Sequence, residues 1–461
     1  MAHSTFWQRR LKTGLLTDAT IGSAFSPGVI ETACLALGHV WRDSFWNPAT
    51  TLLTFLLQVL SSEKTLRAGV ADLLTQLTDL GREDLPSGDP SAYCQARQRL
   101  PFELPLVMMA GAWNRIHRVA KSTGSWVGGH VWIVDGTTIS MPDEPELQTA
   151  FPQPSAQKPG CGFPVARLVV LFCWATGAIR DVVIDSLHTH ELPLFRKLWP
   201  HFQKGDVALC DRAYCSFADM YRLLERGVFC IFRLHHRRRA DFRRGRRLGK
   251  DDQLVTWPRP PWQPKMGLSR EEVAQLPETL TVRLVRITGA PKGFRSRTIV
   301  VVTTLLDPIE TPADDIRALY RDRWLAELNL RSLKTQLGMD VLRGESADVV
   351  TKEIVMHLVA YNLIRLLMWQ AAREHGRDLH RLSFTGTLHR LRDVLPLVLR
   401  AVKQLDRERL LAQLRQWIAD DELPDRPNRF EPRRRKRRPK EYSLLQRPRQ
   451  WYRLHGDPDA R

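Results

Sequence analysis

The middle of the chain carries a series of short apolar runs of β type, and their order constrains the fold more than any other feature. Residues 167–175 and 178–185 are two such runs separated by a tight Thr176-Gly177 turn, which is typical of a hairpin. The runs then alternate with helical patterns, in the order strand 131–134, hairpin 167–185, helix 191–199, strand 206–210, helix 217–225 and strand 227–234. This order predicts a mixed sheet covered by helices.

Residues 236–296 interrupt the alternation with a different composition. Two basic clusters, Arg237–Arg239 and Arg243–Arg247, come first, and four prolines then prevent regular structure. A strand-like pattern follows at Thr279–Thr288, and the β-type pattern of the main series returns at 297–306. We therefore interpret the interruption as a β-rich insertion and not as a separate domain.

Helical patterns flank the β-type region on both sides. Before it, the helix expected over Ala92–Leu100, which Ser91 can cap, carries Arg97 and Arg99. A bundle that contacts DNA and a plain scaffold bundle are both consistent with these arginines. The other helical patterns cover residues 30–41, 51–60, 66–80, 312–337, 355–372 and 382–414.

The chain is strongly basic, with 69 Lys and Arg against 50 Asp and Glu and a formal net charge of +19. Such a charge favours a polyanionic partner, because each Lys or Arg close to a phosphate releases condensed counterions. After Asp420 the chain becomes a basic tail that contains Arg433, Arg434, Arg435 and Lys436. A run of this kind is usually a solvated arm, and here we predict an arm that contacts DNA phosphates.

Three further features of the sequence limit the class of protein: its cysteines, its N-terminus and its apolar runs. The seven cysteines form no C-x-x-C pair, so a zinc finger is not expected. The N-terminus lacks a basic segment followed by an apolar stretch, which a secretory signal would have. The longest apolar runs, 51–60 and 356–369, are too short or too interrupted to span a bilayer. We therefore expect a soluble cytoplasmic protein.

Four side chains share one face of the helical pattern at 312–337. Tyr320, Arg323, Glu327 and Lys334 fall within roughly 60° of one another when each residue turns the helix by about 100°. The face would present a phenol, a guanidinium, a carboxylate and an ammonium. Spacing alone favours the alternative of an exposed face held by (i, i+4) pairs such as Arg323–Glu327.

Two aspartates change this balance. Asp135 and Asp211 each end a short apolar run, at the strand edge where sites are usually built in a sheet covered by helices. With Glu327 they can hold two divalent cations, which activate a water or 3′-hydroxyl and stabilise the leaving oxygen in phosphodiester displacement. Mg²⁺ suits such a carboxylate site, and Mn²⁺ can replace it. Basic residues on the Glu327 helix would then hold DNA phosphates.

Other polar groups are weaker candidates. His188-Thr189-His190-Glu191 resembles a metal cluster, but it lies at a strand-to-helix junction, where capping and surface exposure explain it better. Glu191 stays open as a secondary acidic or DNA-contacting group. Asp322 faces away from the polar helical face and Asp340 lies past it, so neither is the expected third ligand.

Three stretches of the chain carry a family resemblance. Val134-Asp135-Gly136-Thr137 is the first, and Cys210-Asp211-Arg212-Ala213-Tyr214 is the second. The third, Tyr320-x2-Arg323-x3-Glu327-x6-Lys334, has the full spacing of a Tyr-Arg-Glu-Lys signature. Together they resemble the motifs of bacterial insertion-sequence transposases of the insertion-sequence-4 family, within the aspartate–aspartate–glutamate (DDE) class. The resemblance runs from about residue 90 to residue 400.

The resemblance implies a catalytic metal site and a reaction. Asp135, Asp211 and Glu327 would be the catalytic ligands of two Mg²⁺ ions in an RNase H-like core that a mostly β insertion interrupts. The reaction would be cut-and-paste transposition through 3′ nicking, a hairpin at the transposon end and strand transfer. Neither Trp257 nor Trp262 of the insertion can be assigned as a base-stacking residue.

The same resemblance implies contacts with DNA. Tyr320, Arg323 and Lys334 would correspond to residues that grip DNA near the cleaved end. Trp324 follows the signature arginine, where an indole can stack on a displaced base or pack in the core.

We therefore predict an α/β protein, with an RNase H-like mixed sheet flanked by helices, a β-rich insertion and helical N- and C-terminal regions. Its parts are a helical DNA-binding domain at 1–120, a split core at 128–235 and 297–400, the insertion at 236–296, and a C-terminal helical region with the basic tail at 401–461. The expected partners are double-stranded DNA, as terminal inverted repeats and target, and a second copy of the chain on paired ends, at the bacterial nucleoid and without a membrane. The alternatives are a non-catalytic DNA-binding protein descended from a transposase and a nuclease without strand transfer.

Overall fold

The computed structural model describes residues 27–79, 81, 85–120, 125–288, 298–401, 403–424 and 445–456. The chain divides into two compact units. The first comprises residues 1–121 and 329–425 and the second residues 122–328 and 426–461, so the division falls within helix α12 (Trp324–Arg331). The basic arm predicted from Arg433 to Lys436 lies outside the described residues.

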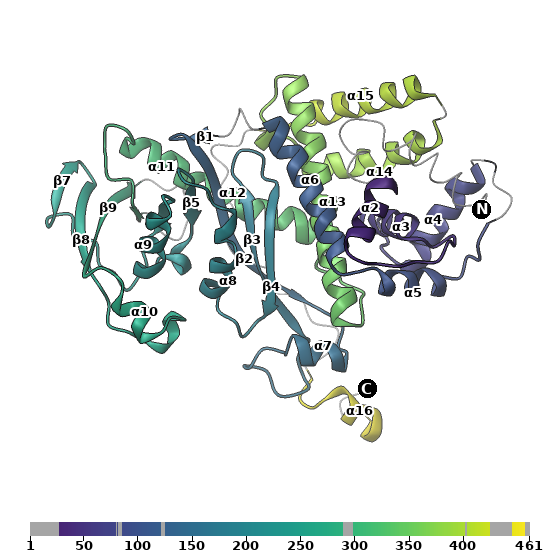
Figure 1. Cartoon of the computed structure of the whole chain (residues 1–461), viewed down its shortest axis with the longest axis horizontal. Coiled ribbons are helices and arrows are strands. Elements are labelled where there is room, and N and C mark those ends of the chain that lie inside the picture. The colour runs from purple at the N-terminus through teal and green to yellow at the C-terminus, as the bar shows by residue number, and fades with distance from the viewer. Residues whose placement is uncertain are drawn as a thin grey trace. The chain divides into compact units, whose positions relative to one another are not determined.

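The second unit is built on one large mixed sheet (Figure 1). Its strands run in the order β4-β3-β2-β5-β6-β10-β9-β8-β7, and β1 pairs with β2. Their bounds are β1 Ser125–Trp126, β2 Gly129–Ser140, β3 Val165–Cys173, β4 Ile179–Ser186, β5 Val207–Cys210, β6 Phe229–Arg233, β7 Arg246–Gly249, β8 Asp252–Pro258, β9 Thr279–Thr288 and β10 Thr298–Thr303. β3 runs antiparallel to β2 and β4, whereas β5 runs parallel to both β2 and β6.

Helices cover this sheet, as the alternating pattern predicts. α8 (Glu191–Lys197) packs against β3 and β4, and α9 (Phe217–Glu225) packs against β6. α9 begins where the Ser216 side chain accepts a hydrogen bond from the backbone N–H of Asp219. All four residues of β5 are buried, which explains why this parallel strand is apolar throughout. The prediction of a mixed sheet flanked by helices is confirmed.

The remaining helices of the second unit are short and lie between or after the strands. They are α7 Pro145–Ala150, α10 Arg270–Ala274, α11 Ala313–Asp322 and α16 Arg449–His455, with 3-10 helices at Trp199–His201, Arg212–Tyr214 and Pro264–Met266. α10 is closed at its start by a capping box, in which the Ser269 and Glu272 side chains each accept a hydrogen bond from the other's backbone N–H.

The strands between residues 246 and 288 extend the same sheet. β9 pairs with β10 and β8 pairs with β9, both antiparallel. A buried ion pair holds them together: Arg283 of β9 donates to both carboxylate oxygens of Asp252 on β8, at 2.8 and 2.7 Å. The same guanidinium donates to the carbonyl of Thr311, 2.7 Å away, before α11. This pair therefore fixes the outer strands to the segment that leads into α11.

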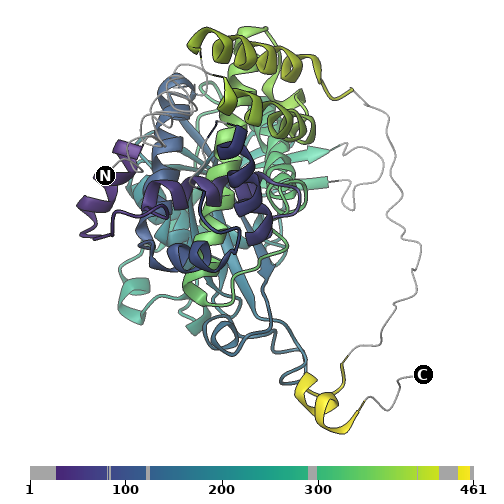
Figure 2. The same ribbon diagram turned by 90° about the vertical axis from the view of Figure 1, so that its right-hand side faces the viewer.

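The first unit is helical. Its bounds are α2 Pro27–Ala36, α3 Pro48–Leu60, α4 Leu66–Asp79, α5 Ser91–Arg99, α6 Glu103–Ala120, α13 Ala347–Glu374, α14 Phe384–Arg400 and α15 Gln404–Asp420. α13 packs against the N-terminal helices α3 and α6 and against α14 and α15 (Figure 2). Among the described residues α13 alone is long and apolar enough to cross a membrane, and 89% of that stretch is buried inside the protein.

The N-terminal helices differ from the prediction in one detail. Ser91 does not cap α5 but is its first residue, and Pro90 precedes it as the cap residue. Arg97 of α5 is 4% exposed, lies 3.9 Å from the ring centre of Phe55 and donates to the side chain of Gln58. Of the two interpretations of this bundle, Arg97 supports the scaffold, because its guanidinium is not available to DNA.

The helical pattern predicted through residues 312–337 is not one continuous α-helix. α11 ends at Asp322, and Arg323 lies in a tight turn with (i, i+3) hydrogen bonds before α12 begins. A π-helical segment, Ser332–Gln336, follows α12 directly. Tight turns and π-helices change the number of residues per turn, so a constant 100° step does not hold. The prediction of one continuous helix is therefore wrong, although Arg323 and Glu327 still pair along one face, and Lys334 lies in the π-helical segment of the first unit.

Candidate active site

Asp135 lies in the middle of β2 and not at its end as predicted. β2 continues to Ser140 because β3 pairs with it that far, whereas β5 stops at Cys210, the register partner of Val134. Asp135 therefore stands at the level where the neighbouring parallel strand ends. Its Oδ1 accepts a hydrogen bond from the backbone N–H of Gly136 at 2.9 Å.

Asp211 follows β5 directly, as predicted. Its Oδ1 accepts a hydrogen bond from the backbone N–H of Ala213 at 2.6 Å and so caps the short 3-10 helix that follows. Because Val134 and Cys210 are partners on parallel strands, the residues after them, Asp135 and Asp211, come side by side.

Arg323 connects the third predicted ligand to the first. Its Nη2 donates to Oε1 of Glu327 at 2.7 Å, and its Nη1 lies 3.8 Å from Oδ2 of Asp135. Glu327 comes from α12 and is 41% exposed, whereas the Asp135 side chain is 17% exposed. The structure thus brings Asp135, Asp211, Arg323 and Glu327 into one cluster of the second unit.

The charges of this cluster act on Asp135. Burial raises the pKa of Asp135 to about 6, Arg323 opposes that rise, and the charge of Asp211 adds to it. A carboxylate that is buried beside a like charge is stabilised in its ionised form by a nearby cation. The electrostatics of the pair therefore favour cation binding.

The donor set fits a hard divalent ion. Within the described ranges, no three His, Cys, Asp or Glu side chains lie close enough together to hold a metal ion as they stand. The Arg323 guanidinium lies between Asp135 and Glu327 and supplies positive charge to both. Mg²⁺ takes few protein carboxylates and keeps several waters, which matches Asp135, Asp211 and Glu327 as the residues that would hold it.

The other signature residues differ in exposure. Tyr320 is 6% exposed, and burial raises its pKa. Trp324 is 43% exposed, so it is a surface indole and not a core residue. Lys334 is half-buried, and burial lowers its pKa.

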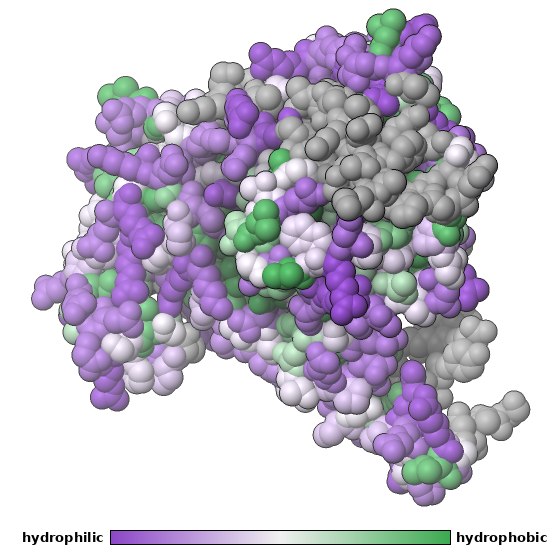
Figure 3. All heavy atoms as spheres, turned by 45° about the vertical axis from the view of Figure 1, so that its right-hand side comes forward, coloured by the Kyte–Doolittle hydropathy of each residue, from purple (hydrophilic) through white to green (hydrophobic). Residues whose placement is uncertain are grey.

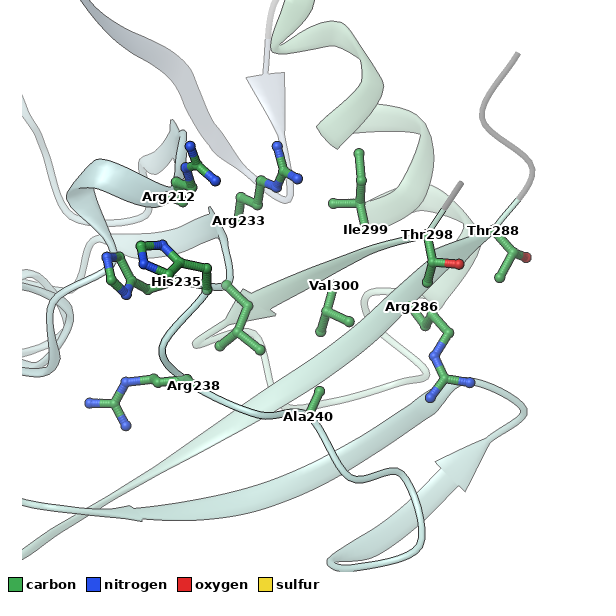
Figure 4. Close-up of a pocket in the computed structure, with 12 residues that line it drawn as sticks. Arg212, Arg233, His235, Arg238, Ala240, Arg286, Thr288, Thr298, Ile299 and Val300 are labelled. Atoms are coloured by element: carbon green, nitrogen blue, oxygen red, sulfur yellow. The ribbon is translucent and has the colours of Figure 1, made fainter. Parts of the chain in front are cut away.

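A basic hollow of about 510 Å³ begins beside the site, next to Asp211. It is lined by Arg212, Arg233, Leu234, His235, His236, Arg238, Ala240, Arg286, Thr288, Thr298, Ile299 and Val300. Figure 4 shows Arg212 and Arg233 on one side of it, Arg286 on another, and Val300 of β10 between them. Four arginines around one open hollow suit an anionic ligand that carries several phosphates.

Aromatic rings hold two of these arginines in place. The guanidinium of Arg238 lies 4.0 Å from the ring centre of Trp257, and that of Arg286 lies 4.0 Å from the ring centre of Phe242. Arg286 also pairs with Asp251 at 2.8 Å. Trp257 is 8% exposed, so its role here is to support Arg238.

The hollow was not predicted as a site. The sequence shows the cluster Arg237–Arg239, but Arg233 and Arg286 join it only because β6, β10 and β9 are neighbours in the sheet. The run of basic residues that follows β6 is the one signal that could have indicated it.

The weaker candidates are mostly explained by local contacts. Asp322 accepts a hydrogen bond from the indole N–H of Trp174 at 3.0 Å. His188 and His190 are exposed, and His190 precedes α8 without making a side-chain cap. Glu191 differs, because its carboxylate lies against Gly136, next to Asp135.

Comparison with known proteins decides the family. A family model described as "Transposase DDE domain" matches residues 127–363, more than half of the chain. The chain belongs to the DDE transposase family. It is 27% identical over 361 residues to the transposase InsG of insertion sequence element IS4 from Escherichia coli strain K12. The aligned region covers 77% of this chain and 78% of that relative. This similarity agrees with the resemblance predicted from the motifs.

A solved structure of a transposase is also similar. The piggyBac transposase, in a synaptic complex with hairpin DNA, aligns with a TM-score of 0.40 and 9% identity, over 90% of this chain and 85% of that chain. Members of the DDE family generally use divalent metal ions.

Proposed function

We propose that this transposase cleaves the ends of an insertion sequence in a metal-dependent reaction and joins them to target DNA by cut-and-paste transposition. One observation carries the proposal. Asp135 and Asp211 are neighbours on parallel strands, and Arg323 ties Glu327 to Asp135, in a chain of the DDE family.

The proposed core is RNase H-like. Its support is the strand order β4-β3-β2-β5-β6, in which three antiparallel strands are followed by two that run parallel to β2. Residues 236–296 would be the insertion, since β7, β8 and β9 join beyond this set. The chain then returns through α11 and α12, which carry Arg323 and Glu327.

The metal ions and the protein would have different roles in the reaction. Two Mg²⁺ or Mn²⁺ ions held by Asp135, Asp211 and Glu327 would activate the attacking water or 3′-hydroxyl and stabilise the leaving oxygen. The backbone N–H groups of Gly136 and Ala213 orient the two aspartates. Both carboxylates are therefore fixed before the substrate arrives, so little reorganisation is needed.

The side chains beside the carboxylates would hold the DNA. Arg323 presents a planar guanidinium suited to a phosphate, and Tyr320 is buried three residues before it. Trp324 is 43% exposed, and an exposed indole can stack on a displaced base. We also include Lys334 and the tail residues Arg433, Arg434, Arg435 and Lys436 among the proposed phosphate contacts.

The basic hollow gives a strand of DNA a path away from the carboxylates. It starts at Arg212, the residue after Asp211, and continues over β6, β10 and β9. Hydrophilic side chains also predominate on the face of the molecule drawn in Figure 3. We propose that the partners are double-stranded terminal repeats and target DNA, bound by a homodimer on paired ends at the bacterial nucleoid.

The test is cleavage of the labelled ends of the element from which the chain derives, with Mg²⁺ or Mn²⁺ against EDTA. Asp135→Ala, Asp211→Ala and Glu327→Ala should each keep DNA binding and lower 3′ nicking by at least about a hundredfold, because removing a ligand weakens the site more than removing an outer partner does. Asp315→Ala, an exposed carboxylate on α11, is the matched control and should nick normally.

The same assay separates the alternatives. A native protein that binds the ends without nicking them, and triad variants that behave like it, would support the non-catalytic DNA-binding protein. Nicking without products joined to a target plasmid would support a nuclease without strand transfer.

A further inference from the structure

The carboxylate of Glu191 is an unassigned acidic group beside the proposed active site. Glu191 is the first residue of α8 and is half-buried. In the described part of the chain, no hydrogen bond or ion pair involves its carboxylate. α8 packs against the 3-10 helix Arg212–Tyr214, which follows Asp211 directly. A half-buried carboxylate without a partner needs an explanation, because polar groups that leave the solvent are normally hydrogen-bonded.

Gly136 shows where this carboxylate lies. A Cβ added to Gly136 would meet Cδ and Oε1 of Glu191 at 2.8 Å and Oε2 at 3.1 Å. Both oxygens therefore lie directly over the residue that follows Asp135. Gly136 has no positive φ, so glycine is needed there for space and not for backbone conformation.

Tyr214 is a second, independent sign of an absent ligand. Its side chain is fully buried, and its hydroxyl has no hydrogen-bond partner. Burial raises the pKa of Tyr214 well above its usual value, and the charges of Glu191, Asp135 and Asp211 raise it further. Tyr214 also lies against α8, the helix that begins with Glu191, because its ring centre is 5.2 Å from that of Phe195. A buried O–H without a partner is rare and indicates a place for an ordered water or ion.

We propose that Glu191 is a fourth acidic group of the catalytic centre, which holds a water of the divalent cation bound by Asp135 and Asp211. The proposal rests on the proposed function. Mg²⁺ and Mn²⁺ keep several waters when few protein ligands bind them, and a carboxylate that accepts from such a water fixes the ion's position. A water of that ion would also give the Tyr214 hydroxyl its missing partner. Glu191 is thus a positioning residue, which acts on the ion through its water.

The test measures Mn²⁺ binding to the full chain without DNA, from the electron paramagnetic resonance signal of free Mn²⁺. Glu191→Gln should weaken Mn²⁺ binding by about tenfold or more, as removal of an outer-shell partner does. The matched control is Glu146→Gln, which also removes an acidic residue from the first turn of a helix in the same unit. Glu146→Gln should bind Mn²⁺ like the native chain.

A second variant moves the carboxylate without removing it. Gly136→Ala keeps the backbone N–H that Asp135 needs, but its methyl group displaces the flexible end of Glu191. Like Glu191→Gln, it should weaken Mn²⁺ binding. If Glu191→Gln fails to fold, Gly136→Ala decides the proposal alone.

Measuring Asp135→Ala in the same experiment separates this proposal from the proposed function. If Asp135→Ala loses Mn²⁺ binding while Glu191→Gln and Gly136→Ala both bind like the native chain, the role of Glu191 is overturned and the triad stands. If all three variants bind like the native chain, the metal site itself is in the wrong place and both proposals fall.

Discussion

Gly136 joins two carboxylates that are far apart in the sequence. Its backbone N–H holds Asp135, and its missing side chain leaves the space that Glu191 occupies. The motif block around Asp135 indicates the glycine, but its contact with Glu191 depends on how α8 packs on the sheet. Sequence spacing carries no information on that packing, so the motifs predict the triad and leave Glu191 open, and the position of Glu191 over Gly136 could not be predicted.

A buried histidine gives the first unit an acid sensitivity. His357 of α13 is 1% exposed, its Nδ1–H donates to the carbonyl of Glu353, and burial lowers its pKa to about 3. Between that value and its ordinary pKa near 6.5, the unfolded chain binds a proton that the folded chain does not. Stability is therefore lost as the pH falls below about 6.5, by at most about 1.4 kcal/mol per pH unit.

His357→Leu should remove part of this loss. Denaturant midpoints followed by tryptophan fluorescence at pH 7.5 and pH 5 would measure it, with His389→Gln, an exposed histidine of α14, as the control. We expect the midpoint to fall less between the two pH values in His357→Leu than in the native chain or the control. Equal falls in all three proteins would contradict the assignment of the acid sensitivity to His357.

At the scale of elements, the patterns predicted strands and helices best where one face of each is buried. The hairpin of β3 and β4 and the helix α9 follow the expected bounds closely. The break at Arg323 and the π-helical segment Ser332–Gln336 were not predicted, because the apolar spacing is compatible with a straight helix. The break matters for the site, since Arg323 leaves α11 at the point where its guanidinium meets Asp135 and Glu327.

The outer strands depend on one buried ion pair. Arg283 is fully buried, so Arg283→Met leaves Asp252 as a buried carboxylate without its cation. We expect a loss of about 3–5 kcal/mol in the free energy of unfolding, as for other broken buried pairs. Calorimetric melting of the full chain would measure this loss. Arg243→Met, which breaks the exposed pair with Asp241, should leave the free energy of unfolding nearly unchanged.

The double variant Arg283→Met/Asp252→Leu tests the cause. Because it removes both charges, it should recover much of the stability lost in Arg283→Met. A double variant as unstable as the single one would mean that packing of the arginine stem, or its bond to the Thr311 carbonyl, carries the stability instead.

At the scale of the whole molecule, sequence patterns show which face of an element is buried but not which element covers it. The helices after residue 329 share a compact unit with those before residue 121, and no pattern in either segment indicates this grouping. The same limit hid the basic hollow, whose arginines come from separate strands. Net charge is the whole-molecule property that sequence gives directly, and its consequence for DNA binding can be measured.

The charge of +19 predicts DNA binding that weakens steeply with salt. Changing Arg433, Arg434, Arg435 and Lys436 together to Gln should lower the slope of log affinity against log salt by up to about 3.6, or about 0.9 for each phosphate that the arm no longer neutralises. Fluorescence anisotropy with a labelled duplex, over a series of salt concentrations, would measure the slope.

The control for this variant must remove the same charge elsewhere. Arg67, Arg377, Lys403 and Arg409 are exposed residues of the first unit, and changing them to Gln lowers the net charge by the same four units. If the tail contacts DNA, the slope should fall more in the tail variant than in the control variant, because counterions are released only where cations meet phosphates. If the slope falls equally in both variants, the tail contributes only its share of the overall charge. If the slope of the tail variant equals that of the native chain, the tail is a solvated segment that does not touch DNA.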